Sequence, residues 1–213
     1  MPQNYEGFYA RFNTFSVEDY PILSGADTLV GDEFKVSFEI ANDKTRAVIT
    51  NRFDYRIGYF GSADTRKLQL IVARDWKMHC QLSFVAFTDE GESSYWGEMC
   101  IISYSPGIAD QFDVFSQNVA DMLAKGIRPD VALSQQGVDE VISSNGSWMP
   151  TGRVPLPETR KGMALVKSRR KASENLIERG REGNKGCYAV SIAFIVVVLV
   201  LVVWLILHVL GIV

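Results

Sequence analysis

Apolar and polar residues alternate along several segments of the first two thirds of the chain, and this period of two is typical of half-buried β-strands. In 34–41, apolar Phe34, Val36, Phe38 and Ile40 alternate with polar residues. Asn42-Asp43 is a turn sequence, so 34–50 is predicted to form a hairpin. Further strands are predicted at 55–60, 78–88 and 95–104.

Three segments have the helical spacing instead. The segment 109–125 places its apolar side chains on one face and is followed by Gly126, which is typical of a helix end. Ser134 is a suitable N-cap for a short helix over about 135–142. The segment 63–76 fits both periods, and we favour a helix capped by Ser62.

The first fifteen residues carry an aromatic residue at i, i+3, i+4, i+7 and i+10. These positions share one face if the segment is helical. We expect this face to pack in the core, with a partner-binding or membrane-contacting face as the alternative. The five residues are Tyr5, Phe8, Tyr9, Phe12 and Phe15.

These elements predict an α+β fold for residues 1–147, a mostly antiparallel sheet or small barrel with appended helices. The segment 187–213 contains no Asp, Glu, Lys or Arg, and a run of this length predicts one C-terminal transmembrane helix. Between them, 148–186 is predicted to be a stalk that is first rich in proline and then basic.

The basic residues of the stalk set the predicted orientation. Because Lys and Arg gather on the cytoplasmic side of a span, the N-terminal domain is expected in the cytoplasm of a tail-anchored, single-pass protein. The same residues are candidates for contact with anionic lipid headgroups, although the orientation signal alone explains them. They are Arg160, Lys161, Lys167, Arg169, Arg170, Lys171, Arg179, Arg181 and Lys185.

Charge restricts the function classes. The chain has a formal net charge of −3, but residues 1–157 hold 13 Lys and Arg against 21 Asp and Glu, a net charge of −8. This balance disfavours nucleic acid as a partner, because nucleic-acid-binding domains normally present a basic face.

Catalytic motifs are absent from the sequence. His79 is the single histidine before 187–213, and any histidine-based enzyme would have to use it. Its neighbour Cys80 would point to the opposite face of a strand. Cys80 and Cys100 are expected to be core thiols, and Cys187 is an acylation candidate. We therefore expect a protein that is not an enzyme and has no cofactor or metal.

One stretch resembles a known family. The segment RAVITNRFDYRIGYF (46–60), the candidate helix at 63–74 and MHCQLSFVAF (78–87) are similar to HIRAN modules, so that about 34–104 shares their order of elements. This resemblance implies a small β-barrel with a helix, in a family that binds single-stranded DNA ends. It makes four residues candidates for base stacking and phosphate contact: Arg52, Tyr55, Arg56 and Tyr59.

The sequence as a whole thus predicts a membrane-tethered, non-catalytic interaction domain in the cytoplasm. Its expected partners are the lipid bilayer and a protein that it recruits to the membrane. The alternative is a HIRAN-like module that binds single-stranded nucleic acid.

Overall fold

The structure, a computed structural model, describes residues 2–41, 43–89, 93–182 and the single positions 194, 198 and 204. The chain divides into two compact units, residues 1–170 and 171–213. In the second unit, helix α5 (Ala172–Glu182) begins where the backbone N–H of Lys171 donates to Oε2 of Glu174 at 2.7 Å. All other elements belong to the first unit.

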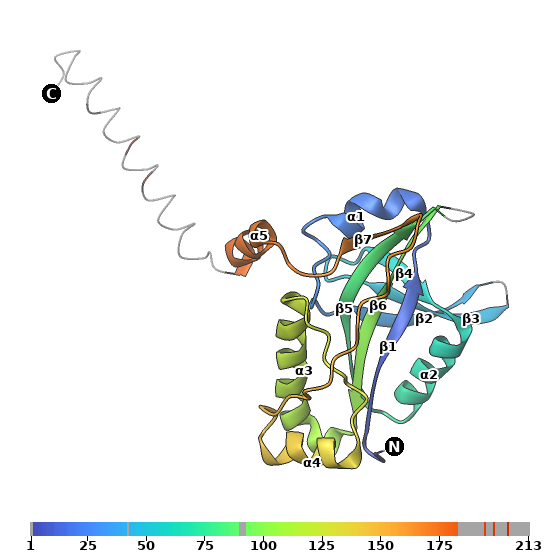
Figure 1. Cartoon of the computed structure of the whole chain (residues 1–213), viewed down its shortest axis with the longest axis vertical. Coiled ribbons are helices and arrows are strands. Elements are labelled where there is room, and N and C mark those ends of the chain that lie inside the picture. The colour runs from blue at the N-terminus through green and yellow to red at the C-terminus, as the bar shows by residue number, and fades with distance from the viewer. Residues whose placement is uncertain are drawn as a thin grey trace. The chain divides into compact units, whose positions relative to one another are not determined.

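The first unit is built on one antiparallel sheet with the strand order β2-β3-β4-β1-β6-β5-β7. Three longer helices and three short helical segments accompany it (Figure 1). The strands are β1 (Tyr5–Asn13), β2 (Lys35–Ala41), β3 (Lys44–Thr50), β4 (Arg56–Phe60), β5 (Lys77–Thr88), β6 (Ser94–Tyr104) and β7 (Met163–Lys167). The longer helices are α2 (Ser62–Ala73), α3 (Ala109–Ala124) and α4 (Gln135–Ser143), and the short segments are η1 (Val17–Asp19), α1 (Tyr20–Ser24) and η2 (Pro106–Ile108).

The sheet closes on itself. Residues 31–34 lead directly into β2, and they hydrogen bond with the middle of β5: Gly31 N–H donates to the carbonyl of Leu82 at 2.8 Å, and Phe34 N–H to that of Cys80 at 2.7 Å. Because β2 and β5 lie on opposite sides of β1 in the strand order, this contact converts the curved sheet into a small barrel. Of the two predicted alternatives, an antiparallel sheet or a small barrel, the antiparallel sheet with appended helices is confirmed.

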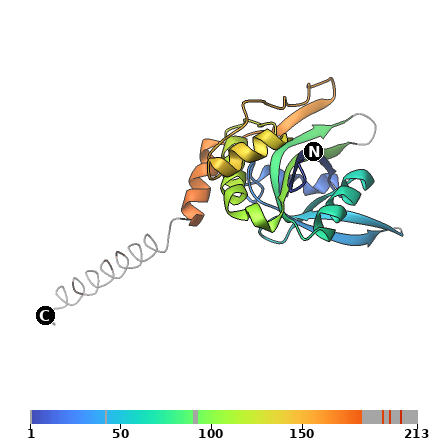
Figure 2. The same ribbon diagram turned by 90° about the horizontal axis from the view of Figure 1, so that it is seen from below.

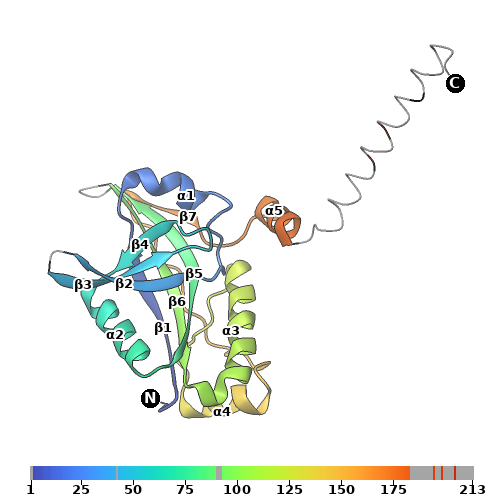
Figure 3. The same ribbon diagram turned by 180° about the vertical axis from the view of Figure 1, so that it is seen from behind.

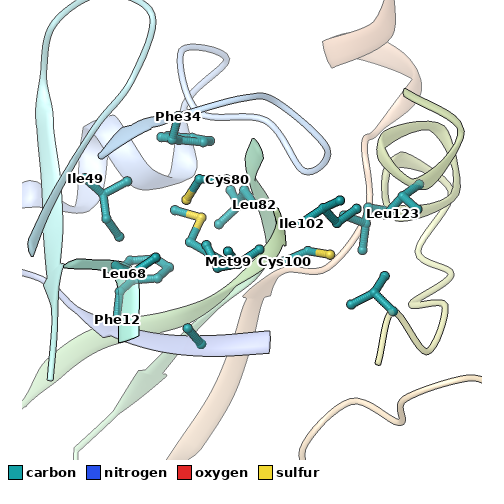
Figure 4. Packing of buried hydrophobic residues seen from close by; sticks show 14 of the residues in the cluster. Phe12, Phe34, Ile49, Leu68, Cys80, Leu82, Met99, Cys100, Ile102 and Leu123 are labelled. Carbon is teal, nitrogen blue, oxygen red and sulfur yellow. The ribbon is translucent and has the colours of Figure 1, made fainter. Parts of the chain in front are cut away.

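Buried apolar side chains of one large cluster lie on both faces of the long strands β1, β5 and β6. Inside the barrel, Figure 4 shows Phe12, Leu68, Leu82 and Met99 gathered together, all completely buried. On the opposite face, Ile102 lies toward Leu123 of α3. Since both faces are buried, β6 has the continuous apolar run 99–102 in place of a clean alternation.

The helices pack on these two faces of the long strands. In Figures 1 and 3, α2 lies on one side of β1, β5 and β6, and α3 and α4 lie on the other side. Seen from below, α2 lies between the long strands and the β2–β3 hairpin (Figure 2), and it packs against β3 and β5. The predicted helices at 63–76, 109–125 and about 135–142 are confirmed, and the N-cap of α4 is Ser134 as expected. The N-cap of α2 is Gly61 rather than Ser62.

Residues 5–13 are a strand and not a helix, so the aromatic residues of the first fifteen positions do not share one helical face. Residues 5–13 form β1, which pairs with β6 along its whole length and with β4 at its end. In a strand, Tyr5 and Tyr9 point to one face, and Phe8 and Phe12 point to the other. Both faces of β1 are covered by apolar elements, and each face therefore carries aromatic residues. Together these residues have a spacing similar to that of one face of a helix.

The predicted boundary at residue 147 also changes. The compact unit continues to Arg170, because β7 pairs with β5 and the preceding chain is hydrogen bonded to the unit. The segment expected to be a free stalk is thus in part a seventh strand. A short strand with one polar position gives too little periodicity to be distinguished from a linker.

The structure does not support the predicted membrane anchor. Within the part of the chain that the structure describes, no helix is both long enough and apolar enough to cross a bilayer. The predicted C-terminal transmembrane helix is therefore withdrawn from the fold class, together with the single-pass, tail-anchored description. Apart from Phe194, Val198 and Trp204, its segment 187–213 lies outside the described residues.

Candidate functional site

The outer face of β2, β3 and β4 carries a cluster of arginines and aromatic rings. Arg46 of β3 is the register partner of Glu39 of β2, and Val48, two residues further along β3, is the partner of Tyr59 of β4. The register of β4 shifts between Ile49 and Thr50, so Arg56 lies opposite Thr50 and reaches the same face as Tyr59. A β-bulge therefore places Arg46, Arg56 and Tyr59 together.

Phe15, which follows β1, completes this arginine–aromatic surface, defined here as Phe15, Arg46, Arg56 and Tyr59. The rings of Phe15 and Tyr59 are 5.3 Å apart. The guanidinium carbon of Arg46 lies 4.4 Å from the centre of the Tyr59 ring, and that of Arg56 lies 4.5 Å from the centre of the Phe15 ring. Cation–π contacts of this kind hold the guanidinium groups flat against the rings.

One carboxylate serves both arginines. Arg46 donates to Oε1 of Glu39 at 2.8 Å, and Arg56 donates to Oε2 at 2.7 Å. The hydrogen bond from Arg46, with the positive charge of Arg56, lowers the pKa of Glu39. The cluster still has one positive charge in excess, and the Nε of Arg46 is buried without a hydrogen-bond partner in the described structure. It is therefore a locally cationic surface on an acidic domain.

The turn before β4 extends this region with further exposed rings. Asn51 is almost completely buried, and its Oδ1 accepts from the backbone N–H groups of Phe53 and Tyr55, both at 3.0 Å. Its side-chain amide donates to the carbonyl of Asp27 at 3.0 Å. This Asx-type turn leaves the Phe53 and Tyr55 side chains 42% and 49% exposed.

The four residues implied by the family resemblance are thus only partly brought together. Arg56 and Tyr59 belong to the arginine–aromatic surface. Arg52 and Tyr55 lie on the adjoining turn, where the guanidinium carbon of Arg52 is 5.0 Å from the Phe53 ring centre. Sequence reasoning missed Phe15, which it expected to pack in the core with the other aromatic residues of the first fifteen positions, and Arg46, although Arg46 lies within the segment that carries the resemblance.

A second polar cluster surrounds His79 on β5. Its Nδ1 lies 2.8 Å from Oε1 of Glu33, and its Nε2 lies 2.7 Å from the hydroxyl of Tyr104 and 3.2 Å from Oδ1 of Asp113. Burial alone would lower the pKa of His79, but the carboxylates of Glu33 and Asp113 raise it. Lys77 pairs with Asp113 at 2.6 Å.

This cluster links three parts of the fold. Glu33 lies in the barrel-closing segment, Asp113 on α3 and Tyr104 at the end of β6. Both ring nitrogens of His79 already contact protein groups, so the arrangement holds α3 against the barrel. The local sequence pattern does not predict this polar cluster, because the two carboxylates are 46 and 34 residues from His79 in sequence. Cys80 lies beside it in sequence but is buried inside the barrel, as expected for a core thiol.

Two residues predicted to contact lipid headgroups have other roles. Lys167 is buried, and its Nζ donates to the carbonyls of Gly25 and Thr28 at 2.8 and 2.7 Å. Arg170 donates to the carbonyl of Val30 at 2.7 Å and pairs with Asp32 at 2.8 Å. The expectation that these two contact a membrane surface is corrected, because they fasten β7 and its neighbourhood to residues 25–32.

The other predicted lipid contacts divide according to their position. The side chains of Arg160, Lys161, Arg169 and Lys171 are exposed, and Arg179 and Arg181 lie on α5. Lys185 and the acylation candidate Cys187 lie outside the described residues. No family model matches the chain, and no curated protein matches it. The geometry of the site therefore carries the functional argument.

Proposed function

We propose that this protein is a non-catalytic binding module that holds single-stranded nucleic acid on its arginine–aromatic surface. The observation that carries the proposal is the bulge-dependent assembly of Arg46 and Arg56 with the rings of Phe15 and Tyr59. Proteins that bind single strands combine cationic groups, which contact the backbone phosphates, with aromatic side chains on which bases stack. This surface provides both chemistries.

The geometry suits an extended strand. The surface is an open sheet face, and the exposed rings of the 51–55 turn precede β4 directly in sequence. Bases can stack on Phe15, Phe53 and Tyr55, while the two guanidinium groups donate to phosphate oxygens. Arg56 and Tyr59 are two of the four residues that the HIRAN resemblance makes candidates for base stacking and phosphate contact.

The net charge of −8 over residues 1–157 is the main argument against this function. Association depends on the local field as well as on the total charge. In the cluster one carboxylate, Glu39, is shared between two arginines, so the surface keeps an excess positive charge. We expect binding that is modest in affinity and that weakens measurably as the salt concentration rises.

A protein partner, the other expectation from the sequence, has one observation in its favour. Phe15 is followed by Val17 and Tyr20, and these three apolar side chains are each more than a third exposed. A protein that docks on them would bury apolar area, and its affinity would depend only weakly on salt. The two functions are thus distinguished by the salt dependence of binding.

The experiment is fluorescence anisotropy of the full chain with labelled single-stranded DNA and RNA of about 12 nucleotides, a length typical of such sites. Arg56→Gln removes one guanidinium and Phe15→Leu removes one ring. We expect each to weaken binding by about tenfold, since one stacked base or one charged contact is worth about 1–3 kcal/mol.

The matched control is Arg66→Gln. Arg66 is an exposed arginine on α2, outside the arginine–aromatic surface, and its loss changes the net charge by the same amount. If Arg66→Gln weakened binding as much as Arg56→Gln, the effect would be one of total charge and the proposed site would be refuted. Binding that is absent at low salt would refute the function itself.

A further inference from the structure

We infer that a second site, a pocket between β1 and α2, binds a small molecule that carries a planar ring and one anionic group, either a carboxylate or a phosphate. The pocket has a volume of about 890 Å³, within the range typical of small-molecule sites. It lies where the start of β1 approaches the C-terminal end of α2 (Figure 1). None of its lining residues belongs to the arginine–aromatic surface.

The walls of the pocket follow from the sequence. A Cβ atom on Gly7 would lie 2.1 Å from the carbonyl oxygen of Val131, so only glycine allows residues 131–133 to approach β1 this closely. The hydroxyl of Tyr5 donates to the same carbonyl at 2.8 Å. Leu133, just beyond this contact, forms an apolar wall opposite α2.

The charge of the pocket selects an anion. Lys67 and Arg74 are seven residues apart on α2 and its C-cap, so they project from the same side of the helix. Both use Glu6 as their partner: the Lys67 Nζ lies 3.1 Å from Oε1, and the Arg74 Nη1 lies 3.8 Å from Oε2. Glu6 is the one acidic residue in the lining described, so one positive charge is left in excess.

Arg74 is the cation that is available to a ligand. Its distance of 3.8 Å from Glu6 is too long for a hydrogen bond, whereas Lys67 is held by Glu6 and by the Phe8 ring, whose centre is 3.4 Å from Nζ. A carboxylate or a phosphate would accept two parallel hydrogen bonds from the planar guanidinium of Arg74.

The ring specificity comes from Trp76. This residue follows Asp75, whose φ of 55° turns the chain sharply after α2. The Trp76 side chain lines the pocket, with the Arg74 guanidinium carbon 5.2 Å from its ring centre. A planar ligand ring can stack against this Trp–Arg pair while its anionic group contacts the guanidinium, and the side-chain amide of Gln3 adds a polar group to the lining.

The test is isothermal titration of the full chain with four probes. Adenosine monophosphate and indole-3-acetate each carry a ring and an anionic group, adenosine carries the ring alone, and inorganic phosphate carries the charge alone. We expect at least one of the first two to bind with a Kd below about 1 mM, and to bind at least about tenfold more tightly than adenosine and phosphate. Which of the two binds shows whether the pocket takes the purine phosphate or the indole carboxylate.

Variants locate the binding. Arg74→Gln is expected to weaken the bound probe by about tenfold, because it removes the charge-assisted hydrogen bonds. Trp76→Leu is expected to abolish the preference for a ring, whereas Arg66→Gln, on the exposed side of α2, is expected to change nothing. Unfolding curves in urea check that each variant folds, and Arg74 is half exposed, so its loss should leave the fold intact.

The inference fails if neither ring-bearing anion binds, if adenosine binds as tightly as its monophosphate, or if Arg74→Gln binds like the original chain. Arg56→Gln separates the two sites. It should weaken oligonucleotide binding and leave the small probe unaffected, whereas Arg74→Gln should do the reverse. A small probe that is lost in Arg56→Gln would place its binding on the arginine–aromatic surface and overturn this inference.

Discussion

The segment after α3 is fastened to the sheet by one buried arginine, and its replacement gives the sharpest stability prediction. Arg128 is 5% exposed, and its Nε donates to the Ser83 hydroxyl at 2.8 Å. Its Nη1 donates to the carbonyl of Pro155, and its Nη2 pairs with Glu98 of β6. The guanidinium also lies 4.5 Å from the centre of the Tyr9 ring. Three hydrogen-bond partners and one aromatic ring thus contact one planar group.

The magnitude follows from what Arg128→Met leaves behind. Removing one member of a buried ion pair costs about 3–5 kcal/mol, because the other charge stays without a partner. The Glu98 side chain is 25% exposed, so water can solvate part of the abandoned carboxylate. We therefore expect a loss of about 3 kcal/mol in the free energy of unfolding, at the lower end of that range. Arg128→Lys should recover only part of it, since one ammonium group cannot reach all three partners.

Urea unfolding of the four members of a double-mutant cycle measures this loss. The double variant Arg128→Met/Glu98→Gln lacks the uncompensated carboxylate. We expect it to be more stable than the sum of the single changes predicts, by about 1 kcal/mol or more. Limited proteolysis should at the same time cut the chain near Pro155 more readily in Arg128→Met. A change below about 0.5 kcal/mol in Arg128→Met would refute the argument that this arginine holds the segment.

Three further predictions concern stability. Because the pKa of His79 is raised in the folded protein, its contribution is fully present below the unfolded pKa of about 6.5 and is lost as the pH rises through the folded pKa. Urea unfolding should thus show that His79→Gln costs more at about pH 6 than at about pH 8.5, and a cost that is constant or grows with pH would contradict the carboxylate contacts. Leu82 is fully buried inside the barrel, so Leu82→Ala should lower the free energy of unfolding by about 2–5 kcal/mol. Ile40 is 82% exposed, so Ile40→Ala should change it by no more than about 0.5 kcal/mol. Equal effects of the two changes would contradict the described core. Gly97→Ala would place a Cβ 2.2 Å from the carbonyl oxygen of Phe84 and should lower the free energy of unfolding by about 1–3 kcal/mol or more, measured by thermal unfolding. A Cβ on Gly107 would meet nothing within 4 Å, so Gly107→Ala should leave the melting temperature nearly unchanged.

Local pattern was sufficient where one face of an element is exposed. Strand β2 alternates apolar and polar residues and is followed by a turn sequence. Helix α3 ends at Ala124, and Gly126 follows its C-cap with a φ of 81° that glycine adopts without strain. Such features need only neighbouring residues, so the sequence shows them directly.

The local sequence pattern did not predict the structure of segments whose conformation depends on long-range packing. All residues of β1 except the exposed Arg11 are buried or partly buried, so β1 lacks the alternation that identifies a strand. The sequence predicted a stalk near Pro155 because Arg128, which donates a hydrogen bond to the Pro155 carbonyl, is 27 residues away. Within the site, Arg56 and Tyr59 could be predicted from their segment. Phe15 reaches them only through the pairing of β1 with β4.

The salt dependence of oligonucleotide binding tests the central claim most directly. Anisotropy titrations of the full chain with a labelled single strand, from low to moderate salt, give the slope of log K against log salt concentration. If Arg46 and Arg56 contact two phosphates, this slope should be about −1.4, and Arg56→Gln should reduce it to about half. Binding that does not change with salt, or a slope that Arg56→Gln leaves unchanged, would contradict nucleic-acid recognition by this surface.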